Sequence, residues 1–359
     1  MNTTTLRFLR TTSQYKGRIQ NSFSPRFTCV NSFHTNSPAI RPRPSSSTTT
    51  LLLRYASTST STLPKDKDIQ VKIHPVNGPL TTLPAPLSPP TRQPSQSLAV
   101  HLLALGKAYI AFYKTGIKNI YTNFKLSRTL QARLDANHSS SLPDAIKAKA
   151  ITRSEFQLLA RNWHDVKRVP LFALVLICCG ELTPLVVIVL TSIVPWTCRI
   201  PKQIQSDRSK LEERRRISFR NLTAKVPEGK RGAGDLDRMQ LLHISWSLGL
   251  CSSVWDYLGG QLPGLPTGVL RRRVVKRVEY LEMDDRLIER AGGVKDMDVE
   301  EVRMALVERG VDVLGREGKG MKSELSAWLK SREKVSVERL LLTRPSAWPV
   351  KASDVKVKL

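Results

Sequence analysis

The stretch Val169–Val194 contains no lysine or arginine and consists mainly of Leu, Ile, Val and Phe, with Glu181 and Pro184 near its middle. A helix that crosses the hydrocarbon core of a bilayer needs about 20 apolar residues. A carboxylate at the bilayer centre costs ~2.5–3.5 kcal/mol, and the apolar side chains offset this at about 0.3–0.6 kcal/mol each. The stretch therefore predicts a single transmembrane helix over residues 169–194, which Pro184 would kink.

Two other structures would also accommodate this apolar run. One is a buried helix inside a large water-soluble core. The other is a pair of short re-entrant helices that are broken at Glu181–Pro184. Hydropathy alone does not distinguish these two structures from a transmembrane helix. It measures only the free energy of moving the segment from water into an apolar environment, which a protein core also provides.

The N-terminal segment has the composition of a targeting sequence. Residues 1–65 contain no aspartate or glutamate, and their arginines and lysines are spread through a stretch rich in serine and threonine. This composition is typical of a mitochondrial transit peptide, predicted over residues 1–55. A disordered basic tail is the alternative. Residues 56–97 are rich in Pro, Ser and Thr and predict a disordered linker.

Two membrane-proximal helices are predicted within residues 98–168. The first runs from about Leu98 to Phe124, with lysines on one side and, on the other, Leu102, Leu105, Ala108, Tyr109, Phe112, Ile117, Ile120 and Tyr121. It is either a core-facing helix or an amphipathic helix lying on the bilayer. The second is predicted from about Thr152, because Thr152 and Glu155 have the spacing of a capping box.

The region after the apolar run is strongly basic and predicts a helical domain. The whole chain carries a net charge of +27, which favours a polyanionic partner. The juxtamembrane segment 195–234 precedes a compact helical unit over residues 235–332 and a tail over residues 333–359. No alternating strand pattern stands out, so the predicted fold class is all-α. The candidate contacts to an anionic partner are Arg271, Arg272, Arg273, Lys276 and Arg277, followed by Arg214, Arg215 and Arg216. Each run could instead be a solvated helix face or a patch for lipid headgroups.

Enzymatic and metal-binding chemistry find no support in the sequence. It contains no phosphate-binding loop, nucleophile elbow or H-E-x-x-H pattern, so no catalytic residue or cofactor is assigned. The five cysteines show no C-x-x-C spacing, so no metal site is assigned. The adjacent carboxylates of Asp284 and Asp285 point in different directions on a helix, which favours capping or salt bridging over metal binding.

The order of these landmarks resembles the LETM family, the leucine zipper–EF-hand transmembrane proteins of the mitochondrial inner membrane. The span-entry residues Asp165, Arg168 and Pro170, then Glu181, Pro184 and Pro195, are similar to the transmembrane signature of that family. The C-terminal half is similar to the family's ribosome-binding domain in its Asp284–Asp285 pair, Gly293-Val294, Arg309-Gly310 and Trp328-Leu329. The chain departs from the family at Cys178-Cys179 and has no EF-hand loop, so a short member of the family is implied.

The resemblance implies a single-pass protein of the mitochondrial inner membrane with its C-terminal domain in the matrix. Two functions follow as expectations. The first is an anchor that binds the mitochondrial ribosome and supports membrane-protein biogenesis and ion homeostasis. The alternative is a component of a K⁺/H⁺ exchange system that uses Glu181 as an intramembrane acid. One helix cannot enclose an ion path, so exchange would require a homo-oligomer or a partner. Glu181 could equally be a structural acid, hydrogen-bonded where Pro184 frees the backbone.

Overall fold

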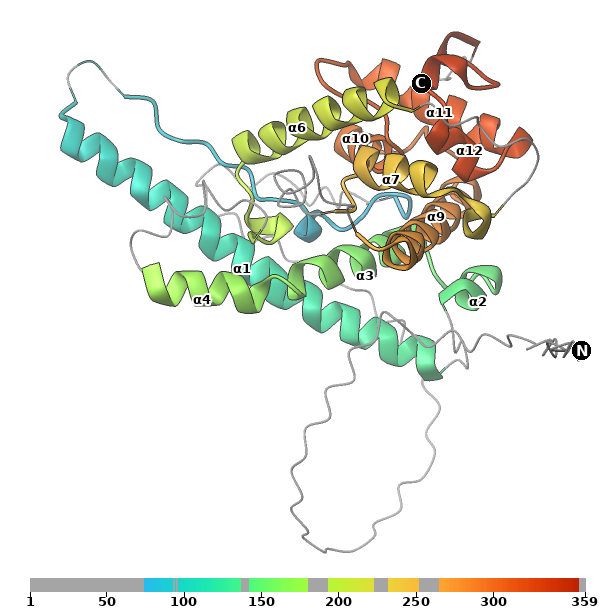
Figure 1. Ribbon diagram of the computed structural model, residues 1–359. Helices are drawn as coiled ribbons and strands as arrows, with labels where there is room; N and C mark the ends of the chain where they lie inside the picture. The colour runs from blue at the N-terminus through green and yellow to red at the C-terminus, as the bar shows by residue number, and fades with distance from the viewer. Residues whose placement is uncertain are drawn as a thin grey trace, which may run out of the picture. The chain divides into compact units, whose positions relative to one another are not determined.

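The computed structural model describes residues 74–92, 94, 96–136, 142–179, 193–222, 232–251 and 265–354 (Figure 1). Every regular element within these ranges is a helix, which confirms the all-α prediction for this part of the chain. These residues belong to one compact unit that begins at Ile73. The predicted transit peptide lies outside the described residues. The α-helices are α1 (Leu98–Ala136), α2 (Leu142–Lys147), α3 (Arg153–Val166), α4 (Val169–Cys179), α6 (Pro201–Arg220), α7 (Arg238–Ser247), α9 (Thr267–Arg290), α10 (Val299–Glu308), α11 (Gly318–Lys334) and α12 (Val337–Leu342).

The largest hydrophobic core lies among α7, α9, α10, α11 and α12. Helix α9 is the central element, because its buried residues recur at intervals of three and four: Leu270, Val274, Val278, Leu281, Asp285 and Ile288. Trp328 of α11 is fully buried and packs edge-on against Trp348, with ring centroids 5.3 Å apart. Leu325 and Leu329 of the same helix are buried here as well.

A second cluster joins the N-terminal helices to α9. Leu130 and Leu134 of α1, Ile146 of α2 and Phe156 of α3 are buried together with Leu287 of α9. The ring of Phe156 also stacks on Tyr280 of α9, with centroids 5.3 Å apart. The helices before and after the apolar run therefore share one core.

Helix α1 is longer than predicted and buries only part of the predicted apolar side, including Phe112 and Ile120. Its buried residues are Phe112, Gly116, Ile120, Asn123, Ser127, Leu130 and Leu134. Ile117 and Tyr121, which the sequence pattern assigned to the same side as Ile120, are 47% and 69% exposed. The backbone of α1 lies close to the short helix Trp196–Cys198. A Cβ atom at Gly116 would lie 2.7 Å from the Cys198 sulfur.

The residues at the two ends of the apolar run lie close together in the fold. Phe172 of α4 packs with Ile120 of α1 and with Val194, which closes the run. Asp165, just before the run, accepts hydrogen bonds from the backbone N–H groups of Trp196 (2.6 Å) and Thr197 (3.3 Å). Glu181 and Pro184 lie outside the described residues. In the described part of the chain, no helix combines the length and apolar character needed to cross a membrane.

The described residues do not confirm the predicted single span over residues 169–194. A straight helix over residues 169–194 would be ~39 Å long and would separate its flanks by the ~30 Å hydrocarbon core. In the structure, Asp165 contacts Trp196, and Arg153 of α3 contacts Asp284 of α9 at 2.8 Å. A bilayer cannot lie between such atoms, so α3 and α9 are on the same side of any membrane. The hydropathy of the run carries no information about where the residues before and after it meet, so the sequence could not predict these contacts.

Candidate functional site

The first half of α9 presents a basic face. Leu270, Val274 and Val278 point into the core, and the side chains at 271, 272, 273 and 276 between them are exposed. Arg271, Arg272 and Lys276 make no ion pair with any carboxylate among the described residues. Their charge is therefore available to a partner from outside the chain. Arg273 is also exposed, and its guanidinium donates to the Leu250 carbonyl at 2.9 Å.

Arg277 differs from the other predicted basic contacts because it is engaged within the fold. Its guanidinium lies 3.9 Å from the Glu308 carboxylate and 5.0 Å from the centre of the Tyr280 ring. Burial is the main reason that the pKa of Tyr280 is raised, and Glu308 adds to it, so the phenol stays neutral. Its hydroxyl donates to Glu308 at 3.1 Å. Arg277 thus attaches α9 to Glu308 of α10 and does not belong to the exposed basic face.

The three consecutive arginines of α6 are likewise divided. Arg215 is only 5% exposed, pairs with Glu212 at 2.5 Å and donates to the Ser247 carbonyl at 3.3 Å. Arg216 is exposed and pairs with Glu213 at 3.1 Å. Arg214 is half-buried and also has an interaction partner. The structure therefore uses Arg215 to pack α6 against the end of α7, and α9 holds the larger exposed basic surface.

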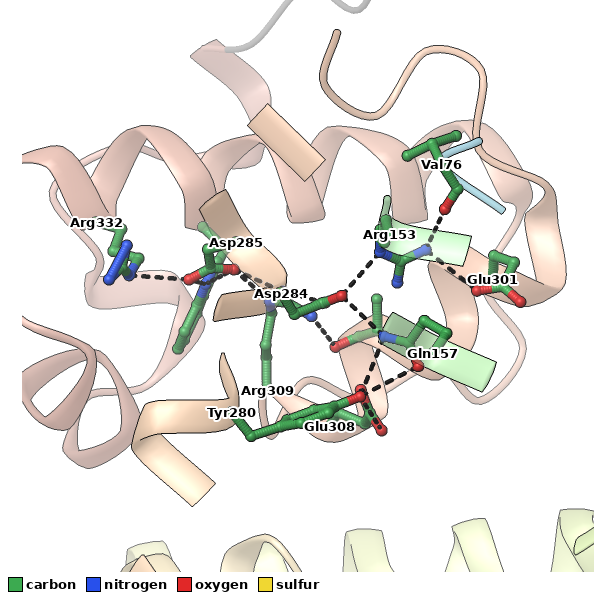
Figure 2. A network of polar contacts seen from close by, with 12 residues as sticks. Val76, Arg153, Gln157, Tyr280, Asp284, Asp285, Glu301, Glu308, Arg309 and Arg332 are labelled. Atoms are coloured by element: carbon green, nitrogen blue, oxygen red, sulfur yellow. Dashed lines mark hydrogen bonds and ion pairs between the residues drawn. The ribbon is translucent and has the colours of Figure 1, made fainter. Parts of the chain in front are cut away.

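A buried network of charges supports α9 from the inside (Figure 2). Asp284 is fully buried and accepts hydrogen bonds from Arg153 (2.8 Å), Gln157 (2.8 Å) and Arg309 (2.8 Å). Burial alone would raise the pKa of Asp284, but the two guanidinium groups outweigh it and hold this pKa well below its usual range. Asp284 is therefore a stable anion inside the protein.

Asp285 points to the other side of α9, as expected for neighbours on a helix. It is fully buried, pairs with Arg309 at 2.6 Å and with Arg332 at 2.9 Å, and accepts from the Trp328 indole N–H at 3.1 Å. The salt bridging predicted for this acidic pair is thus confirmed. Both carboxylates are bound by guanidinium groups, and Arg309 links them.

Glu301 of α10 completes the network. It accepts two hydrogen bonds from Arg161 of α3, at 2.7 and 2.8 Å, and lies 3.2 Å from Arg153. Burial would raise the pKa of Glu301, but Arg161 and then Arg153 lower it overall. Asp298 and Glu301 have the three-residue spacing of a capping box at the start of α10. Asp298 is the N-cap of α10, but its side chain makes no capping bond, because Glu301 is directed at the two arginines instead.

The sequence analysis missed the α3 side of this network. Arg153, Gln157, Arg161 and Asp165 recur every four residues on α3, and each is at most 9% exposed. Such a spacing places four polar side chains on one face of a helix. The predicted capping box at Thr152 and Glu155 is confirmed and starts α3 in the register that directs this face inward.

The predicted span-entry residues have structural partners. Asp165 caps the helix Trp196–Cys198, as described above. Arg168 donates to the His164 carbonyl at 3.1 Å, and Pro170 is exposed in the first turn of α4, where a missing N–H costs no helical hydrogen bond. Within the described ranges, no three His, Cys, Asp or Glu side chains are grouped as a metal ion would require.

Comparison with known protein families assigns the two halves of this unit. Residues 261–347, which include α9, α10, α11 and α12, match the family model described as "LETM1-like, RBD". Residues 96–228, which include α1, α3, α4 and α6, match the pentamidine resistance factor domain. Neither a search of curated proteins nor a search of solved structures gave a match. The basic face of α9 and the acidic pair behind it lie in the first of these segments, and the chain belongs to the LETM family, with a LETM1-like ribosome-binding domain at residues 261–347.

Proposed function

We propose that this protein binds the mitochondrial ribosome at the matrix face of the inner membrane. The observation that carries the proposal is the exposed basic face of α9, formed by Arg271, Arg272 and Lys276, which pair with no carboxylate of the described residues and lie within the segment that matches a ribosome-binding domain. The exposed cations would displace counterions from ribosomal RNA, which gives a favourable and salt-dependent free energy of binding.

The buried network suits this function because it makes α9 a rigid platform. Asp284 and Asp285 attach the second half of α9 to α3, α10 and α11. The exposed basic side chains in the first half then have a fixed spacing, so little conformational entropy is lost when a partner binds them. A ribosome held in this way at the membrane would release membrane proteins close to their site of insertion, and upkeep of ion homeostasis would follow indirectly.

Charge reversal on α9 tests the proposal. The variant Arg272→Glu/Lys276→Glu places two acids four residues apart on the exposed face. The matched control is Lys330→Glu/Lys334→Glu, which makes the same charge change at the same spacing on exposed residues of α11. We expect the α9 variant to reduce co-sedimentation of the full chain with mitochondrial ribosomes by ten-fold or more, and the control to change it by less than about two-fold.

The salt dependence separates a local contact from a general effect of charge. Loss of two phosphate contacts should lower the slope of log affinity against log salt by about 2. Equal losses in both variants would mean that net charge alone drives the association, and retention of binding by the α9 variant would exclude this face as the contact. The exchange hypothesis depends on Glu181, which the described residues do not include.

A further inference from the structure

Helix α1 carries a second apolar stripe that the fold leaves uncovered. Leu103, Ile110, Ile117 and Phe124 recur every seven residues, and Tyr121 lies beside them. These five side chains are between 39% and 69% exposed. At about 100° per residue the stripe is rotated roughly 100° from the face that packs on the protein. The five large apolar side chains form a continuous exposed patch on one side of the helix. Contact of such a patch with water is unfavourable, so it marks a surface that binds another molecule.

Lysines line one edge of this stripe. Lys107, Lys114, Lys118 and Lys125 are exposed, and no acidic residue occurs on α1 before Asp135. An apolar stripe bordered by lysines alone matches the interface of an anionic bilayer, where apolar side chains enter the acyl region and ammonium groups meet the phosphates. The charge pattern therefore specifies the chemistry of the partner.

Helix α4 adds a second exposed apolar surface beside α1. Phe172 anchors α4 on Ile120 of α1, while Leu171, Leu174 and Ile177 are 49%, 55% and 81% exposed. In Figure 1 the C-terminal end of α4 and the N-terminal part of α1 extend away from the other helices in the same direction of the view. The exposure of these three side chains argues against the alternative in which this part of the apolar run is a buried helix of a water-soluble core.

We propose that the exposed stripe of α1, with the exposed side of α4, is a docking surface on which the protein rests on an anionic lipid bilayer from one side. This inference rests on the membrane location in the proposed function and adds the residues and the geometry of the attachment. It agrees with the buried ion pairs that join α3 to α9 and α10, because a protein that attaches from one side keeps these helices in one compartment.

Charge disfavours the other occupants of this surface. A second copy of the chain would bring two lysine-edged stripes together without acids to neutralise them. Ribosomal RNA would pair with the lysines, but its phosphates would leave Leu103, Ile110 and Ile117 in contact with polar groups. A bilayer satisfies both kinds of side chain.

Photocrosslinking from α1 tests which molecule covers the stripe. A benzophenone amino acid is placed at Ile110 or Ile117 of the full chain, in mitochondria supplied with a fluorescent phospholipid. The matched controls are Thr115 and Thr122, which are also seven residues apart and lie about 140° around the same helix. We expect fluorescent lipid adducts from positions 110 and 117, at least about five-fold more than from positions 115 and 122.

A crosslinking product other than a lipid adduct would overturn the inference. Adducts of twice the chain's mass would identify a second copy as the occupant, and adducts to ribosomal RNA or protein would identify the ribosome. Equal lipid labelling at all four positions, or none at 110 and 117, would show that the stripe does not face lipid. If fractionation of mitochondria at physiological salt finds the full chain away from the membranes, the proposed membrane location fails as well. Membrane-bound protein without lipid adducts refutes only the docking surface.

A binding measurement gives an independent readout. The full chain is floated with phosphatidylcholine vesicles that do or do not contain phosphatidylglycerol. Ile110→Glu/Ile117→Glu should lower partitioning into the anionic vesicles by about ten-fold, while Thr115→Glu/Thr122→Glu should lower it by less than about three-fold. Both pairs lie on the surface of α1, so the circular dichroism spectrum should be unchanged. Equal partitioning of the two variants would count against the assignment.

Discussion

Glu301 is the residue at which most of the buried positive charge between the two halves converges. It neutralises Arg161 and Arg153, and all three side chains are at most 9% exposed. Glu301→Gln removes the charge with little change in volume and leaves two buried guanidinium groups under-compensated. We expect the free energy of unfolding to fall by about 3 kcal/mol, measured by urea denaturation.

The neighbouring residue provides the control for this substitution. Glu300 pairs with Arg208 and Arg303 at the surface. Because solvent screens exposed pairs, Glu300→Gln should cost only about 0–1 kcal/mol. A Glu301→Gln protein as stable as the Glu300→Gln protein would mean that the network contributes nothing to folding.

Asp284 makes stability depend on pH in a defined direction. Burial disfavours its charge, but Arg153 and Arg309 hold its folded pKa below the unfolded value of about 3.9. Its stabilising effect is therefore fully present above the unfolded pKa and is lost as the pH falls toward the folded pKa. The melting temperature should fall between about pH 5 and pH 3, and Asp284→Asn, which is less stable at pH 7, should show a flatter decline. Parallel curves for the two proteins would refute this role.

At the scale of the element, α1 is positioned by a glycine. Gly116 and Gly106 lie in the same helix, but a Cβ atom would meet Cys198 and the Thr197 carbonyl oxygen at Gly116 and open space at Gly106. Gly106→Ala should stabilise the protein by about 0.5–1 kcal/mol through helix propensity. Gly116→Ala should instead destabilise it by about 1–2 kcal/mol, because the overpacking penalty exceeds the propensity gain. Thermal unfolding of both variants checks this, and a stabilised Gly116→Ala protein would show that α1 does not pack closely there.

Sequence reasoning succeeded where an element is defined locally and failed where it depends on distant partners. The capping box at Thr152 and Glu155 located the start of α3 correctly because its atoms are three residues apart. The burial of Arg153 and Arg161 could not be predicted, since their carboxylate partners lie 131 and 140 residues further along the chain. On α1, two adjacent apolar stripes were combined into one, and only packing distinguishes buried Ile120 from exposed Ile117.

At the scale of the whole molecule, the two family segments form one body. Arg153, Gln157 and Arg161 belong to residues 96–228, and Asp284 and Glu301 belong to residues 261–347. The ribosome-binding domain is therefore clamped to the helices that carry the exposed apolar stripe. The proposed ribosome contact on α9 and the proposed lipid contact on α1 would then have a fixed relative orientation, so the protein would hold the ribosome at a defined angle to the membrane.

This arrangement predicts that the regions before and after the apolar run share one compartment. An epitope tag inserted between Ala136 and Leu142 precedes the run, and a tag at the C-terminus follows it. In mitoplasts treated with protease, both tags should be protected, and both should be lost when detergent opens the inner membrane. A single span would leave one tag protected and expose the other, because it places the flanks on opposite sides of a ~30 Å barrier. The buried pairs Arg153–Asp284 and Arg161–Glu301 require the two tags to behave alike, since neither pair can form across a bilayer, and the proposed matrix location requires both tags to be protected.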